Sequence, residues 1–542
     1  MKIKELFKDN EQINIQNLLQ KYNINDWQEF LKPTKKSVED FMLYDNMKKG
    51  YDLIHKHINR RIYVLFDCDV DGYCSASILI RYLKQVNKRA NIIPIFHKGK
   101  EHGLSDREVM TFLTQQPDGL LIIPDASGEE KECALLTKKG YEILCIDHHT
   151  NEPNKYMTMI NAQFSEETLN KCGSGTATVY QFLRYLDTMD NKRYSKDLID
   201  LVALGNIADD MSLSNCYNRA INYYGLRRIK NKLLSAMIEK FKAEPTPISF
   251  SFTIIPKINA VIRAGNQELK EYLGCVLSGL TTVSQDDIDN LLIELEKAHR
   301  NQQNIIKKLS TDLSNKIDNK NNFIICEYND CEPNYTGLLA NNIAGKYQKP
   351  TIIIRDNGIG SMRSPVPILE IFNQSDSCDW CKGHDCAAGI KINDIKSFKD
   401  YCNSLDMDFN TEYSVIKSLD VQNIPSYLYG YFDEFNEIFG NDLKEPLYHI
   451  YNIHINGQDI QEIGKSKTTI KFRINDIDFI KFFCSKDWKE KYNIQKDVDM
   501  NIEIIGKLQI NEYEGNTKKQ ILIEEMEIQQ EENNFNFDEL FS

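Results

Sequence analysis

The chain has 542 residues, of which 41% are hydrophobic and 10% aromatic, which excludes wholesale disorder and is enough for roughly two to four domains. Its formal net charge of −13 argues only weakly against a polyanionic partner, since a local basic groove does not show in a whole-chain sum. No apolar run reaches about eighteen residues, so we expect no membrane-spanning helix. The fourteen scattered cysteines, with no visible signal sequence, indicate a reduced, cytoplasmic protein.

Residues 1–60 are expected to form polar helices, after which strands and helices alternate. The predicted strands are short continuous apolar runs, at 61–66, 91–96, 119–123 and 141–146. The predicted helices lie at 75–86, 129–139, 173–186 and 196–205. Apolar runs separated by helices are typical of a parallel sheet covered on both faces, so the predicted fold class is α/β.

A second, smaller α/β unit is predicted beyond a long polar helix at 286–309. It would contain strands at 322–326 and 351–355 and a helix at 336–347. From 448 to 528, alternating apolar and polar runs separated by turns instead predict a small all-β domain of the barrel type. The final segment, 531–542, is acidic with interspersed Phe and is expected to be a flexible tail.

Acidic residues stand where several of these elements end. The four segments are Asp67-Cys68-Asp69-Val70-Asp71-Gly72, Asp125, Asp147-His148-His149 and Asp209-Asp210. The first three follow strands and the fourth follows an apolar helix. Because the carboxyl ends of parallel strands share one edge of a sheet, we expect these side chains to lie together.

Clustered carboxylates repel one another unless a cation neutralises them. Carboxylate oxygens with an imidazole suit Mn²⁺ or Mg²⁺, and two such ions can support hydrolysis of a phosphoester. Gly72 would allow close approach of a phosphate at a helix N-terminus. Any one of these acids alone is as well explained as a turn or cap residue. A calcium loop of the EF-hand type is disfavoured, because Ile78 stands where its glutamate is expected.

These segments resemble the DHH phosphoesterase superfamily, whose four motifs are similar to FDCDVDG (66–72), PDASG (124–128), IDHHT (146–150) and VALGNIADDM (202–211). Four further segments resemble, within that superfamily, the RecJ family of single-stranded-DNA-specific 5′→3′ exonucleases: EHGLS (101–105), KCGSGTA (171–177), YNRAINYYGLRRI (217–229) and PKINAVIRAG (256–265). The resemblance covers nearly the whole chain.

The second α/β unit resembles the DHH-associated domain, through TGLLANNIAGKYQKPTIII (336–354), GSMRS (360–364) and KGHDCAAG (382–389). EIFGNDLKEP (437–446) resembles the segment that leads into the oligonucleotide-binding (OB) barrel of RecJ. The predicted domains are therefore N-terminal helices with the DHH catalytic domain (1–235), a helical connector (236–315), a DHH-associated substrate-binding domain (316–410), a linker with an OB-fold nucleic-acid-binding domain (411–530) and the tail (531–542).

The resemblance implies a two-metal site with Mn²⁺ or Mg²⁺. One ion would be held by Asp69 and Asp125, with Asp67 nearby. The other would be held by Asp71, Asp125 as a bridge, His148 and Asp209. Asp147 would orient the histidines. His149 would either contact the phosphate or contact a metal ligand without binding the metal itself. Substrate-binding residues are expected to be Arg363, Ser364, Gly383, His384, Arg263 and Asn259.

Two departures from the family pattern make the substrate less certain than the chemistry. Ala126-Ser127 follow the second motif's acid, where a cysteine-like residue and Gly are usual, and Lys382 replaces the first Gly of a Gly-Gly-His motif. The predicted function is 5′→3′ hydrolysis of single-stranded DNA to 5′-mononucleotides in replication, recombination or repair. The alternatives are a phosphodiesterase of short oligonucleotides or cyclic dinucleotides, and an inactive replication scaffold.

Three weaker patterns have competing interpretations. Cys378, Cys381, His384 and Cys386 are zinc-like residue types, but their spacing fits no common zinc finger. Single-strand binding by the barrel would use charged and aromatic side chains from Lys465, Lys467, Lys471, Phe472, Arg473 and Phe479, although some of these aromatics are expected in the core. The tail is either a docking peptide for a single-strand-binding protein, helicase or other replication or repair protein, or, as we favour, a frayed terminus.

Overall fold

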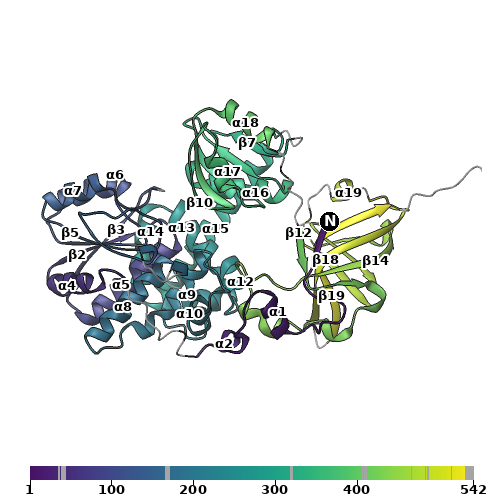
Figure 1. The fold of residues 1–542 in the computed structure, drawn as a ribbon, viewed down its shortest axis with the longest axis horizontal. Coiled ribbons are helices and arrows are strands. Elements are labelled where there is room, and N and C mark those ends of the chain that lie inside the picture. The colour runs from purple at the N-terminus through teal and green to yellow at the C-terminus, as the bar shows by residue number, and fades with distance from the viewer. Residues whose placement is uncertain are drawn as a thin grey trace, which may run out of the picture. The chain divides into compact units, whose positions relative to one another are not determined.

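The computed structural model describes residues 1–34, 37, 44–99, 101–164, 171–317, 321–405, 407, 412–464, 467–482, 484, 488–492, 494–513 and 516–530 (Figure 1). It divides the chain into two compact units. The smaller unit contains Met1–Trp27, Asn410–Phe439 and Leu443–Ser542, and the larger contains Gln28–Phe409 and Gly440–Asp442. Lys465 and the tail at 531–542 lie outside the described residues.

The larger unit begins with a five-stranded parallel sheet of order β3-β2-β4-β5-β6. Its strands are β2 (Arg61–Phe66), β3 (Asn91–Phe96), β4 (Leu120–Pro124), β5 (Glu142–Asp147) and β6 (Thr158–Asn161). The sequence predicts four of the five and misses β6. The predicted α/β fold class is confirmed.

Helices cover both faces of this sheet, as Figure 1 shows. On one face lie α6 (Arg107–Gln115) and α7 (Glu130–Lys138), packed on alternate strand residues such as Tyr63 and Leu65. On the other lie α5 (Val70–Val86) and α8 (Gly175–Met189), packed on the intervening Val64, and α9 (Ile199–Ala208) packs on these two helices. This alternation is the two-residue period of a strand buried on both sides.

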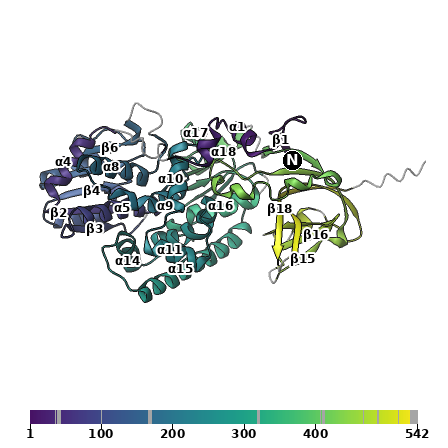
Figure 2. The same cartoon turned by 90° about the horizontal axis from the view of Figure 1, so that it is seen from below.

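The helical part of the larger unit follows the sheet. It comprises α10 (Cys216–Leu226), α11 (Lys232–Phe241), α12 (Pro247–Ser249), a π-helical turn (Phe250–Ile254), α13 (Ile255–Ala264), α14 (Gln267–Ser278) and α15 (Gln285–Ser314). The predicted long helix is α15, which begins with a capping box between Ser284 and Asp287. It packs along α13 and along α11, and Figure 2 shows α11 beside it.

A second sheet in the same unit has the order β10-β11-β9-β8-β7. Its elements are β7 (Ile324–Glu327), α16 (Thr336–Tyr347), β8 (Thr351–Ile354), β9 (Ile359–Arg363), α17 (Leu369–Asn373), β10 (Cys378–His384), β11 (Ala387–Ile392) and α18 (Ile395–Ser404). Only the β7–β8 pair is parallel among these strands. The helix and the two strands predicted here are present.

The smaller unit contains a seven-stranded sheet of order β13-β14-β18-β19-β17-β16-β15. The strands are β13 (Ser418–Asp420), β14 (Tyr448–Asn456), β15 (Gln461–Ile463), β16 (Thr469–Ile474), β17 (Ile477–Lys481), β18 (Asp499–Tyr513) and β19 (Asn516–Gln530). The all-β character predicted for this region is confirmed.

One part of the N-terminal expectation is wrong. The sequence predicts helices throughout residues 1–60, but β1 (Lys2–Glu5) is a strand that pairs in parallel with β12 (Glu412–Val415) within the smaller unit. Its short KIKE sequence carries no apolar period that would mark a strand. No helix in the described ranges is long and apolar enough to cross a lipid bilayer.

Candidate metal centre

The triple-aspartate segment turns from β2 into α5. Asp69 is the N-cap of α5, and its Oδ1 accepts a 3.0 Å hydrogen bond from the Gly72 N–H. A Cβ on Gly72 would lie 2.6 Å from Asp67 Cβ. Gly72 is therefore required by its packing against Asp67, which is a different reason from the phosphate approach expected from the sequence. Because Asp69 caps the helix, α5 begins five residues before the predicted start at residue 75.

Asp125 follows β4 with φ at 62°, in the left-handed region that is uncommon for residues other than glycine. Its backbone N–H donates to Ile146 O at 2.8 Å, which ties it to the end of β5. A Cβ on Gly175, at the start of α8, would lie 2.1 Å from Asp125 Oδ1. The Asp125 carboxylate is therefore held between the strand ends and the first turn of α8.

Asp147, the last residue of β5, holds the two histidines that follow it. Its Oδ1 accepts hydrogen bonds from the backbone N–H of His148 at 2.7 Å and from the backbone N–H and Nδ1 of His149 at 3.2 and 2.9 Å. Although burial opposes it, the hydrogen bond and charge of His149 lower the pKa of Asp147. Asp147 thus orients the His149 ring and fixes the backbone of His148.

The unpredicted strand β6 and the 3₁₀ turn that follows it (Ala162–Phe164) also hold these histidines. Asn161 Nδ2 donates to His149 O at 3.0 Å, and Gln163 Nε2 donates to His148 O at 2.8 Å. No sequence motif marks either residue, since a four-residue strand with polar ends resembles an ordinary loop.

Asp209 is the C-cap residue of α9, which ends in a Schellman-type turn. The Met211 N–H donates to Asn206 O at 3.0 Å and the Asp210 N–H to Ile207 O at 3.3 Å. Asp210 takes the left-handed position of that turn, with φ at 53°, where glycine is usual. The turn directs the Asp209 side chain toward the strand ends.

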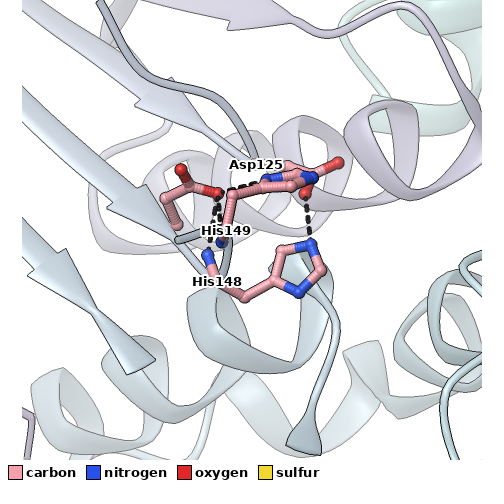
Figure 3. A group of neighbouring side chains, drawn as sticks. Asp125, His148 and His149 are labelled. Atoms are coloured by element: carbon pink, nitrogen blue, oxygen red, sulfur yellow. Dashed lines mark hydrogen bonds and ion pairs between the residues drawn. The ribbon is translucent and has the colours of Figure 1, made fainter. Parts of the chain in front are cut away.

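Three side-chain atoms from these elements converge. His148 Nε2 lies 3.3 Å from Asp125 Oδ1 (Figure 3) and 3.4 Å from Asp209 Oδ2. All three atoms are buried and, within the described ranges, none has a hydrogen-bond partner. Burial and nearby carboxylates raise the pKa of Asp125 and of Asp209 well above the usual range, and burial and His149 lower the pKa of His148. Buried acceptors without donors fit a divalent cation such as Mn²⁺ or Mg²⁺.

The described residues contain four groups of potential ligands whose atoms all lie within 4.8 Å of one another, and two of these groups consist entirely of residues predicted to hold or adjoin the ions. One group is Asp67, Asp69 and Asp125, and the other is Asp71, His148 and Asp209. The contact between His148 and Asp125 joins them. The structure therefore brings together all six residues predicted to hold or adjoin the two ions.

Asp71 is well supplied with donors, in contrast to Asp125 Oδ1 and Asp209 Oδ2, which have none in the described chain. Its Oδ2 accepts from the Gly175 N–H at 2.7 Å, and its Oδ1 accepts from the N–H and Oγ1 of Thr176 at 3.1 and 2.5 Å. The N-terminus of α8 thus fixes the orientation of this carboxylate.

Two histidines near Asp67 are site residues that the sequence reasoning missed. His102 Nδ1 lies 2.5 Å from Asp67 Oδ2, and His97 Nε2 lies 3.4 Å from Asp67 Oδ1. The Gly103 N–H donates to Asp67 Oδ1 at 3.2 Å, and Asp106 Oδ2 lies 2.9 Å from His97 Nδ1. A usable signal was present, because His97 directly follows β3 in the same way as the acids follow their strands.

Arg263, in the last turn of α13, is near enough to both Asp69 and Arg363 for its charge to affect the pKa of each. Burial and the charges of Asp67 and Asp71 raise the pKa of Asp69, and the charge of Arg263 opposes that rise. Burial and the nearby Arg263 lower the pKa of Arg363, at the end of β9, to about 10. Two neighbouring guanidinium groups repel each other, and a phosphate between them would relieve that repulsion.

The other predicted substrate residues have different environments. Gly383, with φ at 141°, needs to be glycine, because a Cβ would lie 2.7 Å from Ala387 O. His384 is exposed. The pKa of His148 is lowered mainly by burial and by the charge of His149, and the charge of His384 adds a smaller effect in the same direction. Ser364 Oγ donates to Val366 O at 2.5 Å, so it serves the local turn. Asn259 Oδ1, one turn before Arg263 on α13, is buried with no hydrogen-bond partner in the described chain.

The zinc-like residues form no compact ligand group. None of the groups of potential metal ligands found among the described residues contains Cys378, Cys381 or Cys386. His384 and Cys381 lie on β10 with opposite exposure, one exposed and one buried. The pattern is explained by a strand that packs one side into the core of the second sheet.

In the smaller unit, several predicted strand-binding side chains are already engaged. Phe472 and Phe479 are buried and stacked on each other, with ring centroids 4.7 Å apart, so they belong to the core. Lys471 Nζ lies 2.8 Å from Asp478 Oδ2, and Arg473 Nε lies 3.8 Å from Asp478 Oδ1. These three charged residues line a hollow of about 320 Å³.

The chain matches two known families. Residues 61–206 match the N-terminal domain of the DHH family, and residues 418–525 match the RecJ OB domain. A Bacillus subtilis protein that bears the name of an SPbeta prophage-derived single-strand DNA-specific exonuclease, YorK, is 30% identical over 561 aligned positions, which cover 94% of this chain and 95% of YorK.

More distant relatives carry the RecJ name. The single-stranded-DNA-specific exonuclease RecJ of Bacillus subtilis is 22% identical over 88% of this chain and 63% of its own length. The crystal structure of RecJ from Thermus thermophilus in complex with Mn²⁺ superposes with a TM-score of 0.76 at 20% identity, over 94% of this chain and 75% of that one. The fold is therefore shared across both units.

Proposed function

The chain belongs to the RecJ-like exonucleases of the DHH phosphoesterase superfamily, and from this premise we propose that it degrades single-stranded DNA from the 5′ end to 5′-mononucleotides. The observation that carries the proposal is the convergence of three buried ligand atoms without donors, His148 Nε2, Asp125 Oδ1 and Asp209 Oδ2. Phosphodiester hydrolysis follows from that site, whereas strand preference and polarity come from the family.

We propose that the site takes two Mn²⁺ or Mg²⁺ ions. The first would be held by Asp69 and Asp125, with Asp67 beside them. The second would be held by Asp71, Asp125, His148 and Asp209. When bound, such ions lower the pKa of a water molecule and stabilise a leaving oxygen. The crystal structures of the Thermus thermophilus RecJ in complex with Mn²⁺ and with Mg²⁺ support this choice of metal.

The residues around the acids would orient the reacting phosphate. Arg263 and Arg363 supply two guanidinium groups that can share its oxygens. The imidazole of His149, held by Asp147, adds a donor from the side of β5. His384 adds another from β10, with the conformation of its hairpin set by Gly383. The neutral His148 ring keeps its lone pair available as a ligand.

The smaller unit is proposed to hold the single strand beyond the reacting end. The match of residues 418–525 to the RecJ OB domain supports this and argues against the first alternative, since a dinucleotide needs no extended track. The second alternative, an inactive scaffold, is disfavoured because every proposed ligand position retains an acid or a histidine.

We place the activity in the cytoplasm, on the strength of the scattered cysteines and the absence of a disulfide framework in the sequence. A protein partner of the replication or repair type is a further proposal, with 531–542 as its docking peptide. A pull-down with the full chain and with a variant lacking 531–542 tests it, and an unchanged set of partners would contradict it.

The enzymatic test uses purified protein, Mn²⁺ and single strands labelled at the 5′ or the 3′ end, with duplexes and dinucleotides as competing substrates. We expect mononucleotide release from the 5′ end of single strands, and its loss in Asp125→Ala and His148→Ala. Equal activity in the variants would contradict the site. Activity on dinucleotides alone would contradict the exonuclease.

A further inference from the structure

A tripeptide far along the chain is built into the catalytic unit. Gly440–Asp442 belong to the larger unit, although Phe439 and Leu443 on either side belong to the smaller one. Gly440 has φ at 139°, and a Cβ there would lie 3.1 Å from Pro247 and 3.2 Å from Leu213. The backbone at this point is therefore shaped to fit against the surface that it contacts.

Asp442 makes the principal contacts of this tripeptide. Its Oδ1 accepts from the Leu213 N–H at 2.6 Å, and its Oδ2 accepts from Ser212 Oγ at 2.6 Å and Ser214 Oγ at 2.7 Å. The adjoining Asn441 Nδ2 donates to Met211 O at 2.7 Å. One carboxylate and one amide thus bind four consecutive residues, and hydrogen bonds to an ionised acceptor are the stronger kind.

The loop that they bind starts directly after the proposed metal ligand Asp209. Asp209 ends α9, Asp210 reverses the chain in the left-handed conformation, and the loop from Met211 follows. From the other side, Asn218 Nδ2 donates to Ser212 O at 3.1 Å. The backbone that carries Asp209 is consequently held between α10 and the tripeptide.

We propose that Asp442 is a positioning residue that fixes the Asp209 turn for metal binding. This rests on the proposed function. The Asp209 side chain has no hydrogen-bond donor at Oδ2 in the described chain, so its direction depends on the backbone turn that carries it. Removing the support of that turn allows Asp209 Oδ2 to move away from His148 Nε2 without altering any ligand.

The test measures Mn²⁺ binding to the full chain by calorimetry, alongside exonuclease kinetics. For Asp442→Ala we expect Mn²⁺ affinity to fall by about tenfold and kcat to fall similarly, with KM for single-stranded DNA within about twofold. Asp442→Asn should recover part of the Mn²⁺ affinity and part of kcat, because its amide oxygen still accepts from the Leu213 N–H. Glu434→Gln, an exposed carboxylate in the preceding segment, is the matched control and should resemble wild type.

Wild-type Mn²⁺ affinity and kcat in Asp442→Ala would overturn the proposal, as would an equal loss in Glu434→Gln. If Asp442→Ala does not fold, by its melting profile, Ser212→Ala with Ser214→Ala decides, since it removes two of the three bonds to the carboxylate. Normal Mn²⁺ binding in that double variant would overturn the proposal too. In a further outcome, the wild-type protein cleaves no DNA while Asp442→Ala still weakens Mn²⁺ binding. That result would support the positioning role of Asp442 and contradict the proposed function.

Discussion

Asp67 and Asp125 follow neighbouring strands of one sheet, β2 and β4, yet their carboxylates have opposite surroundings. Both oxygens of Asp67 have donors, from His102 and from Gly103, and His97 lies close by. Oδ1 of Asp125 has no donor in the described chain and faces His148. We refer to Asp67, His97, His102 and Asp106 as the Asp67 cluster, and to Asp125, His148 and Asp209 as the Asp125 cluster.

The difference separates two uses of buried charge. Despite burial, the histidines of the Asp67 cluster lower the pKa of Asp67, so the protein itself stabilises that charge. In the Asp125 cluster, burial and nearby acids raise the pKa of Asp125 and Asp209, so stabilisation must come from a ligand. The Asp67 cluster should therefore contribute to folding, and the Asp125 cluster to binding and catalysis.

The largest expected effect is that of Asp125→Ala on activity. Because Asp125 is the proposed bridge, exonuclease activity should fall by more than about a thousandfold. Unfolding in urea with EDTA present should show only the small loss of stability expected for alanine at φ 62°, since the Oδ1 acceptor that is removed has no donor. Asp312→Ala, an exposed aspartate on α15, is the control. A large loss of stability in metal-free Asp125→Ala would erase the distinction between the clusters.

Asp67→Ala should have its main effect on stability, whereas Asp125→Ala should have its main effect on activity. Asp67→Ala leaves the buried Gly103 N–H and the largely exposed His102 ring without their acceptor, so the free energy of unfolding should fall by about 1 to 2 kcal/mol in EDTA. Urea unfolding beside Asp125→Ala measures the contrast. Equal stability of the two variants would show that the donors around Asp67 contribute nothing to folding.

The two clusters should also respond differently to pH. Carboxyls with a raised pKa keep their protons to higher pH, so protons compete with Mn²⁺ for the Asp125 cluster. Mn²⁺ affinity should therefore fall by about tenfold or more between pH 8 and pH 6, with protons released on binding. Calorimetry in buffers of different ionisation enthalpy counts those protons. An affinity independent of pH would mean that the cluster is already ionised.

The smallest expected effect concerns cationic side chains of the smaller unit that already form ion pairs within the protein. Asp478 engages Lys471 and Arg473, as the histidines engage Asp67. Asp478→Asn should tighten binding of single-stranded DNA by only about two- to threefold. It should also steepen the slope of log Kd against log salt by about 0.7 for each cation that gains a phosphate contact. Fluorescence anisotropy of labelled oligonucleotides across a salt series measures both, and an unchanged slope would place these cations outside the DNA track.

The ends of strands were the part of the site that the sequence could predict. Asp67, Asp125 and Asp147 each follow a continuous apolar run, and the parallel topology then brings them to one edge. The sequence could not show which carboxylates would acquire donors, because His102 and Gly175 reach them from distant segments. It also missed β6, which is too short to carry a period.

The pairing of β1 with β12 has a consequence for synthesis. Lys2 pairs with Glu412, about 410 residues later, so β1 must wait for its partner for roughly 20 to 80 seconds of translation. Most of the smaller unit follows the larger unit in the sequence, but Met1–Trp27 precede it. A tag placed next to β1 would therefore disturb the two-stranded β1-β12 sheet of the smaller unit, and a fragment that starts after the DHH-associated domain would lack one of the strands of that unit.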